Sequence, residues 1–242
     1  MTTTERISPL HEDLVALLHV TRAVERDLFA MLDAERRDAA GTIGEWSAKD
    51  VQAHLAAWRA IEARRLRASA TDDPSLTAGD PATTDPEDAS NARIQADHAD
   101  WPWAAVADEA DAATEALIGA INLSSTDLLC ECEGTSAGTG ANGVNHAMAH
   151  LSDIARLAGD DARFTRFAAE VEEILHRNHL PPRDSGTILY NVACHRALSG
   201  ELDAARQLLR TAFARRPDLV EYAPNDSDLA ALRDELGALA AP

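Results

Sequence analysis

Apolar residues recur every three or four positions along four segments in the first two-thirds of the chain. The first segment begins at Ser8-Pro9, where proline suits the opening turn of a helix, and continues to about Arg37. Such spacing places the apolar side chains along one face of a helix. The pattern predicts four helices over residues 8–37, 46–70, 104–122 and 141–158.

The second of these helices has the clearest start. Ser47 is a good N-cap residue, and Asp50 follows it three positions later, as an acidic relative of the glutamate in a capping box. The face that we expect to point inward carries a histidine and a tryptophan among its apolar residues. It comprises Val51, His54, Leu55, Trp58, Ile61 and Leu66.

Two stretches of turn-forming residues separate the predicted helices. Residues Thr71–Ser90 contain three prolines and many Asp and Thr residues, which predicts a loop. It is long for a compact bundle and therefore indicates a flexible or functional segment. Residues Cys130–Gly143 form a second connection, rich in Gly, Ser and Thr, and Gly159 ends the fourth helix.

The rest of the chain has shorter periodic segments. Prolines and glycines separate them into helices, which we expect over residues 161–179, 186–198, 201–215 and 226–240. No segment shows a persuasive strand-like alternation. The sequence thus predicts an all-α protein, with a four-helix bundle in residues 1–160 and a smaller helical part in residues 161–242.

Composition and charge narrow the functional classes. Hydrophobic residues make up 45% of the 242 residues, enough to bury a core, and a net charge of −19 repels phosphate backbones. We therefore expect no nucleic-acid partner. The start of the chain lacks a signal-peptide pattern, and no stretch approaches the ~18 apolar residues of a membrane span. The three cysteines lack a disulfide-framework spacing, which is typical of a reducing compartment. Together these features predict a soluble cytoplasmic protein without a membrane partner.

Three histidines could carry chemistry. His146 and His150 are four positions apart, which places both imidazoles on one side of the last bundle helix, and Asp153 follows at the next turn. His54 lies on the inward face of the second helix, and side chains from facing helices meet in a bundle core. Three neutral imidazoles hold Zn²⁺, Ni²⁺, Mn²⁺ or Fe²⁺ and leave a position open. Spacing alone is a weak signal, because a lone core histidine is more often structural.

Two segments resemble the DinB-like superfamily. Residues 45–58 (EWSAKDVQAHLAAW) resemble its second-helix signature, closest to the ClbS/DfsB and mycothiol-dependent maleylpyruvate isomerase branches. Residues 145–151 (NHAMAHL) resemble its last bundle helix, and the likeness covers about Ser8–Gly159. This resemblance implies a four-helix bundle that binds a divalent metal, zinc first among the candidates, through His54, His146 and His150. The isomerase branch often has Glu where this chain has His146, which weakens the isomerase assignment and preserves a metal ligand.

The last part of the chain resembles a tetratricopeptide repeat, closest to the terminal unit of such arrays. The likeness rests on residues 190–194, 197–201, 204–205 and 216–218. One repeat cannot bury its own apolar face, so it must pack on neighbouring helices. The resemblance implies a protein-contact role, and a helical cap that stabilises the bundle is an equal alternative.

Three functions follow from these resemblances. The first is a metal-dependent enzyme of the thiol-transferase or detoxification type, in which the metal activates a low-molecular-weight thiol such as mycothiol towards a small electrophile. The thiol rests on the resemblance alone. The alternatives are a ClbS-like protective hydrolase of a reactive natural product and a non-catalytic scaffold that binds a protein partner through the repeat.

Cys130 and Cys132 are a weaker metal or redox candidate, and Trp101-Pro102-Trp103 is a predicted hydrophobic clasp.

Overall fold

The computed structural model describes residues 7–41, 45–78, 86–131 and 139–240. Within these ranges the regular elements are helices, as the sequence predicts. The chain divides into two compact units, Met1–Phe164 and Thr165–Pro242, each described separately below.

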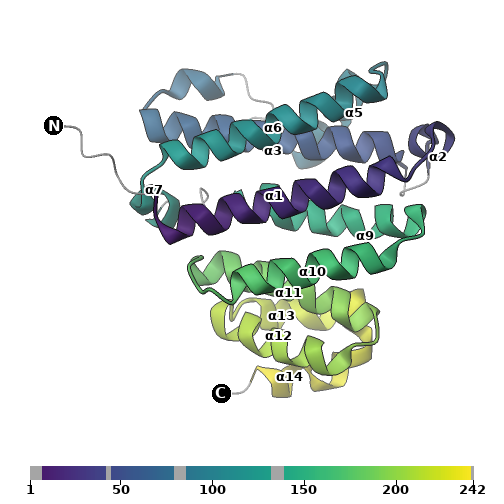
Figure 1. The fold of residues 1–242 in the computed structure, drawn as a ribbon. Helices are drawn as coiled ribbons and strands as arrows, with labels where there is room; N and C mark the ends of the chain where they lie inside the picture. The colour runs from purple at the N-terminus through teal and green to yellow at the C-terminus, as the bar shows by residue number, and fades with distance from the viewer. Residues whose placement is uncertain (1–6, 42–44, 79–85, 132–138, 241–242) are drawn as a thin grey trace. The chain divides into compact units, whose positions relative to one another are not determined.

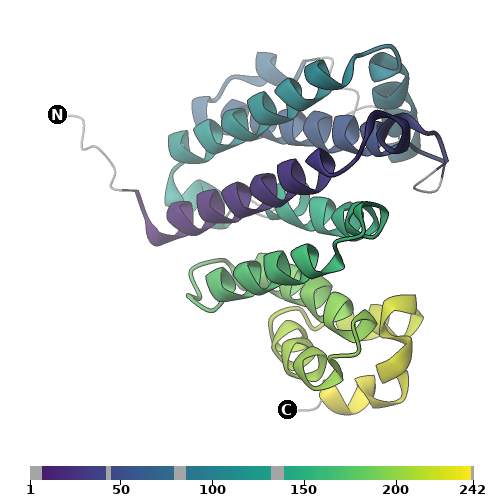
Figure 2. The ribbon, with the colours of Figure 1, turned by 45° about the vertical axis from the view of Figure 1, so that its right-hand side comes forward.

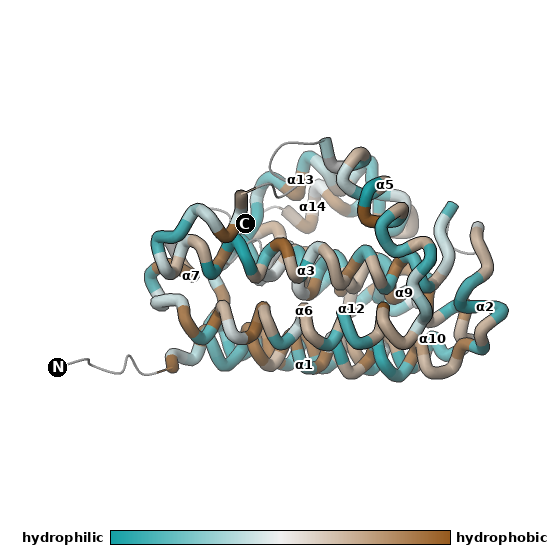
Figure 3. The backbone as a smooth tube through the Cα atoms, turned by 90° about the horizontal axis from the view of Figure 1, so that it is seen from above, coloured by the Kyte–Doolittle hydropathy of each residue, from teal (hydrophilic) through white to brown (hydrophobic). Residues whose placement is uncertain are grey.

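Four long helices of the first unit pack side by side (Figure 1). Each carries hydrophobic and hydrophilic residues mixed along its length (Figure 3). None of the described helices is both long enough and apolar enough to span a bilayer. The four are α1 (Pro9–Ala30), α3 (Ala48–Thr71), α6 (Trp103–Leu123) and α9 (His146–Ala158).

The first predicted helix is wrong in its last part, because α1 ends at Ala30 and not near Arg37. Asp33 caps a separate short helix, α2 (Ala34–Asp38), by accepting a hydrogen bond of 2.9 Å from the backbone N–H of Arg36. A side-chain acceptor at this point satisfies a new set of helix N-terminal donors, so the chain turns and restarts.

Helix α3 starts as predicted. The backbone N–H of Asp50 donates to Ser47 Oγ at 3.0 Å, and the backbone N–H of Ser47 donates to Asp50 Oδ2 at 2.9 Å. This reciprocal capping box fixes the first turn of α3, and with it the register that carries His54 inward.

The prediction of a loop over Thr71–Ser90 is partly wrong. The segment contains the 3₁₀ turn η1 (Pro74–Thr77) and the start of α5 (Glu87–His98), which packs on α3. Helices α3 and α6 run in the same direction (Figure 1), so the connection has to return along their length, and α5 is part of it. The sequence pattern missed α5 because Ile94 is its one large apolar residue.

The second predicted connection, Cys130–Gly143, is also partly helical. It includes the end of α7 (Thr126–Glu131) and the start of the π-helical turn η2 (Ala141–Asn145), which continues directly into α9. Gly159 closes α9 with φ of +75°, as predicted for a glycine after a helix.

Alanines line the contact between α3 and α6. Ala56, Ala110 and Ala113 are buried together, and such small side chains let two helix backbones approach closely. Val106, Leu117 and Ile121 of α6 are fully buried and form its inward face.

The second unit is built on a pair of packed helices, visible in Figure 2. They are joined through Gly200, whose φ of +80° allows a tight turn. Helix α10 (Asp161–Leu175) contains the division between the units. The pair is α11 (Pro182–Leu198) and α12 (Leu202–Arg215). The tetratricopeptide resemblance stays a prediction.

Two predicted elements of the second unit differ in detail. Helix α11 starts at Pro182, four residues before the predicted Gly186, since proline fits the first turn of a helix. The predicted last helix, residues 226–240, is largely the 3₁₀ segment η4 (Ser227–Glu235), followed by the short α14 (Leu236–Leu239).

Candidate metal centre

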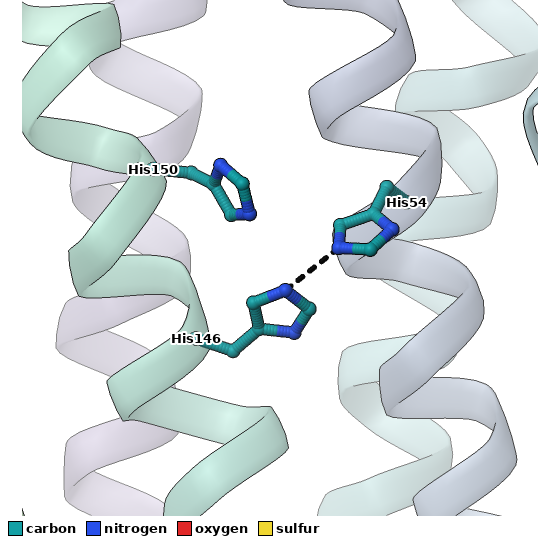
Figure 4. Close-up of side chains that lie close together, drawn as sticks. All are labelled: His54, His146 and His150. Atoms are coloured by element: carbon teal, nitrogen blue, oxygen red, sulfur yellow. Dashed lines mark hydrogen bonds between the residues drawn. The ribbon is translucent and has the colours of Figure 1, made fainter. Parts of the chain in front are cut away.

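Three imidazole rings converge between α3 and α9 (Figure 4). His54 comes from α3, and His146 and His150 come from successive turns of α9. One ring nitrogen of each lies within 4.8 Å of those of the other two. The ring centroids are 4.5 Å apart for His54 and His146, 5.3 Å for His54 and His150, and 5.1 Å for His146 and His150. The structure thus brings together the three residues singled out in the sequence.

The closest pair shares a hydrogen bond. Nε2 of His54 and Nε2 of His146 are 2.7 Å apart, so one neutral ring donates and the other accepts. In a tetrahedral zinc site, metal–nitrogen bonds of about 2.0–2.1 Å place two ligand nitrogens roughly 3.3 Å apart. A small outward rotation of the two rings would therefore make room for a metal ion in place of the proton between the two Nε2 atoms. Three imidazole nitrogens are a donor set that fits a divalent ion.

Burial keeps the three rings neutral. It lowers the pKa of His54 to about 2, with further lowering by His146 and His150. It lowers the pKa of His146 to about 4, helped by His150 and Arg59. It also lowers the pKa of His150, although the Asp153 carboxylate opposes this. Because imidazole binds metal only when it is neutral, the site is ready for a ligand role at neutral pH.

Two tryptophans flank the cluster. The Trp46 ring lies 4.6 Å from His54, edge to face, and stacks on His150 at 6.3 Å. Trp58 lies 6.3 Å from His54 and 6.4 Å from His146, and its Nε1–H donates to Asn91 Oδ1 of α5 at 3.0 Å. The helix missed in the sequence therefore holds one wall of the site.

His54 lacks the outer contact that usually orients a metal-binding histidine. Its Nδ1 is buried and has no hydrogen-bond partner among the described residues. Ligating histidines commonly donate this second N–H to a carboxylate or carbonyl. The ring is held instead by packing against Trp46 and Trp58.

A buried ion-pair network beside the histidines was not foreseen from the sequence. Both guanidinium Nη atoms of Arg59 donate to the Glu25 carboxylate, and both side chains are almost completely buried. Arg22 also donates to Glu25, at 3.0 Å. Burial raises the pKa of Glu25, but the charges and hydrogen bonds of Arg59 and Arg22 outweigh it, so the net pKa is lowered. The only sequence signal was the charged residues at inward helix positions.

The same network reaches the turn that presents His146. Arg59 Nη2 donates to the carbonyl oxygen of Gly143 in η2 at 3.2 Å. A Cβ atom on Gly143 would lie 2.6 Å from Leu18 Cδ2, so glycine allows α1 to pack closely on this turn. Single π-helical turns are rare and often occur at functional sites. Here Arg59 and Leu18 contact the π turn at Gly143, three residues before the candidate ligand His146.

A buried carboxyl group lies two helical turns along α3 from His54. Glu62 is 2% exposed and accepts a hydrogen bond of 3.4 Å from Asn142 Nδ2 of η2. Burial raises the pKa of Glu62 to about 7, against the lowering effects of Asn142 and Arg65. Glu62 belongs to none of the sequence motifs described above.

The remaining sequence candidates lie outside the cluster. Asp153 pairs with Arg156 at 2.7 Å and is not part of the three-histidine group. Cys130 is exposed, and Cys132 lies outside the described residues. Trp103 of the predicted clasp packs on Phe29 at 5.4 Å, whereas Trp101 is 39% exposed and lies against His98.

The second unit contains another group of candidate ligand atoms, from Cys194, Asp226 and Asp228. Tyr190 donates to Asp226 Oδ2 at 2.8 Å, and Asp226 Oδ1 caps η4 through the backbone N–H of Asp228. Burial raises the pKa of the Cys194 thiol, which keeps it protonated. These contacts describe a structural hydrogen-bond network.

No family model, curated protein or solved structure matches the chain. The DinB-like and tetratricopeptide resemblances therefore stay predictions, and the site is interpreted from its own geometry.

Proposed function

We propose that His54, His146 and His150 together bind one divalent metal ion, zinc in the first instance. We further propose that the chain is a metal-dependent enzyme of the DinB-like kind, which joins a low-molecular-weight thiol to a small electrophile. The observation that carries the metal proposal is the convergence of three neutral imidazole nitrogens within 4.8 Å, from two packed helices. An ion held by three imidazoles keeps a position open and lowers the pKa of a thiol or water bound there.

The protein's own residues would define the surroundings of that position. His54 is 3% exposed, whereas His146 and His150 are half-buried, so a small molecule would approach past the α9 ligands. Trp46 and Trp58 flank the rings and exclude water from their sides. Arg59 and Glu25 hold the turn before His146 through the Gly143 carbonyl.

The thiol part of the proposal rests on the resemblance of residues 45–58 and 145–151 to branches that include mycothiol-dependent enzymes. A protective hydrolase would use the same open position for water. A non-catalytic scaffold would need no open coordination position. The three alternatives therefore differ in what the purified protein binds.

The metal proposal can be tested by elemental analysis of the full chain, purified without a histidine tag. We expect about one zinc per chain, and a loss of most of it in each of His54→Ala, His146→Ala and His150→Ala. His19→Ala is the matched control, because His19 is exposed on α1 and should not affect the metal content. Full metal content in His54→Ala, with the fold intact, would show that the triad is not the site.

Cobalt substitution separates the thiol and water alternatives. If the open position accepts a thiol, adding mycothiol to the cobalt-loaded protein should produce a sulfur-to-cobalt charge-transfer absorption. The His54→Ala variant should not show it. Metal binding without this absorption would contradict the thiol proposal and favour a hydrolase.

A further inference from the structure

A second feature of the first unit lies on the surface between α3 and α6. It is a groove with a volume of about 630 Å³, within the range of 300–1,000 Å³ that small-molecule sites occupy. None of the three histidines or their flanking tryptophans lines it. Its lining residues are Ala60, Ala63, Arg64, Arg67, Glu115, Ala116, Gly119, Ala120 and Leu123.

The floor of the groove consists of small residues. Ala60 and Ala63 lie along one side of α3, and Ala116, Gly119 and Ala120 lie along the facing side of α6. The space above this floor is open, since a Cβ atom on Gly119 would meet no atom within 4 Å. Leu123, at one end, is 51% exposed and extends the apolar surface of the groove.

The rim of the groove carries positive charge in a strongly acidic chain. The side chains of Arg64 and Arg67 are exposed and form no ion pair or hydrogen bond with any of the described residues, although the net charge is −19. Many other arginines are paired with a carboxylate, as Arg163 and Arg206 are. Guanidinium groups bind carboxylates through two parallel hydrogen bonds, so two unpaired arginines beside an apolar floor match an anionic amphiphile.

We propose that this groove binds a free carboxylate amphiphile of the medium-chain fatty-acid type. Arg64 and Arg67 pair with its carboxylate, and its hydrocarbon chain covers the alanine and glycine floor. The seven-residue span from Ala60 to Arg67 corresponds to about 10 Å along α3, the length of a medium acyl chain and not of a long lipid. Glu115 is the one acidic residue in the lining, and its charge opposes the ligand.

The proposal can be tested by calorimetric titration of the full chain with decanoate, and with decanol as an uncharged probe of the same length. We expect one saturable site for decanoate, weaker binding of decanol, and an affinity that falls with added salt. The double variant Arg64→Gln/Arg67→Gln should bind decanoate at least about tenfold more weakly. Arg166→Gln, a variant of an exposed arginine in the second unit, should bind decanoate as the original chain does.

Two further variants test the geometry. Ala116→Leu fills the groove floor from an exposed position and should abolish binding without changing the helical circular-dichroism signal. Glu115→Gln removes the opposing charge and should strengthen decanoate binding. Equal binding of decanoate and decanol, or no saturable binding, would overturn the proposal. A concentration-dependent dimer that Ala116→Leu disrupts would also overturn it, because the groove would then be an interface between two copies.

Discussion

The buried Glu62 gives a prediction whose size can be worked out from the structure. Its pKa is raised from 4.5 to about 7, chiefly by burial, and its side chain is 2% exposed. The folded protein therefore holds this proton more tightly than the unfolded chain does. Between pH 4.5 and pH 7 the native state binds more protons, so the free energy of unfolding falls as the pH rises. The rise of the Glu62 pKa from 4.5 to about 7 corresponds to a loss of about 3 kcal/mol in the free energy of unfolding once the group is ionised.

The substitution Glu62→Gln isolates this effect, because glutamine has nearly the shape of the protonated carboxyl and cannot ionise. We expect the two proteins to be about equally stable near pH 4.5. The variant should be about 3 kcal/mol more stable by pH 8. Contributions from the histidines are common to both proteins and cancel in the difference.

Urea unfolding followed by tryptophan fluorescence is the suitable assay. All four tryptophans lie between positions 46 and 103, so the signal reports on the first unit. Measurements at several pH values should be made with a chelator present, to keep metal binding out of the result. Glu115→Gln, a change at an exposed glutamate, should show no such pH dependence. A stability difference between Glu62→Gln and the original chain that is the same at pH 5 and pH 8 would show that Glu62 does not have a raised pKa in the folded protein.

Three other predictions follow from the same unit. Glu25→Gln leaves the Arg59 guanidinium buried without its charged partner, so urea unfolding should show a loss of about 3–5 kcal/mol, whereas Glu25→Leu/Arg59→Met should lose less than the single variant. Metal affinity, measured by competition with a coloured chelator, should persist below pH 6.5, because burial lowers the pKa of all three histidines; a steep loss centred at pH 6.5 would contradict this. Gly143→Ala should lower the free energy of unfolding by about 1–3 kcal/mol, because its Cβ would lie 2.6 Å from Leu18 Cδ2, and an unchanged melting curve would show that Leu18 moves aside freely.

The sequence was informative where chemistry and position coincide within one helix. Ser47 and Asp50 define the first turn of α3, and this places His54 on the inward face together with Val51 and Leu55. His146 and His150 are one turn apart in α9, so their shared face could be predicted from spacing alone.

Features that depend on contacts between distant segments could not be predicted in this way. The pairing of Glu25 with Arg59 joins residues 34 positions apart, and nothing in either local pattern selects the partner. Helix α5 buries Ile94 but has no apolar stripe, so its packing on α3 comes from tertiary structure. The π turn at Gly143 likewise depends on Leu18 and Arg59, which come from two other helices.

X-ray absorption spectroscopy at the zinc edge of the zinc-loaded full chain would identify the metal ligands themselves. We expect three nitrogen ligands at about 2.0–2.1 Å, with the outer-shell scattering of imidazole rings, and one further light ligand. In His54→Ala the imidazole scattering should fall by one ring or the metal should be lost. A spectrum without three imidazoles would contradict a metal centre built from His54, His146 and His150. Cysteine sulfur among the ligands, in protein measured without any added thiol, would contradict it as well.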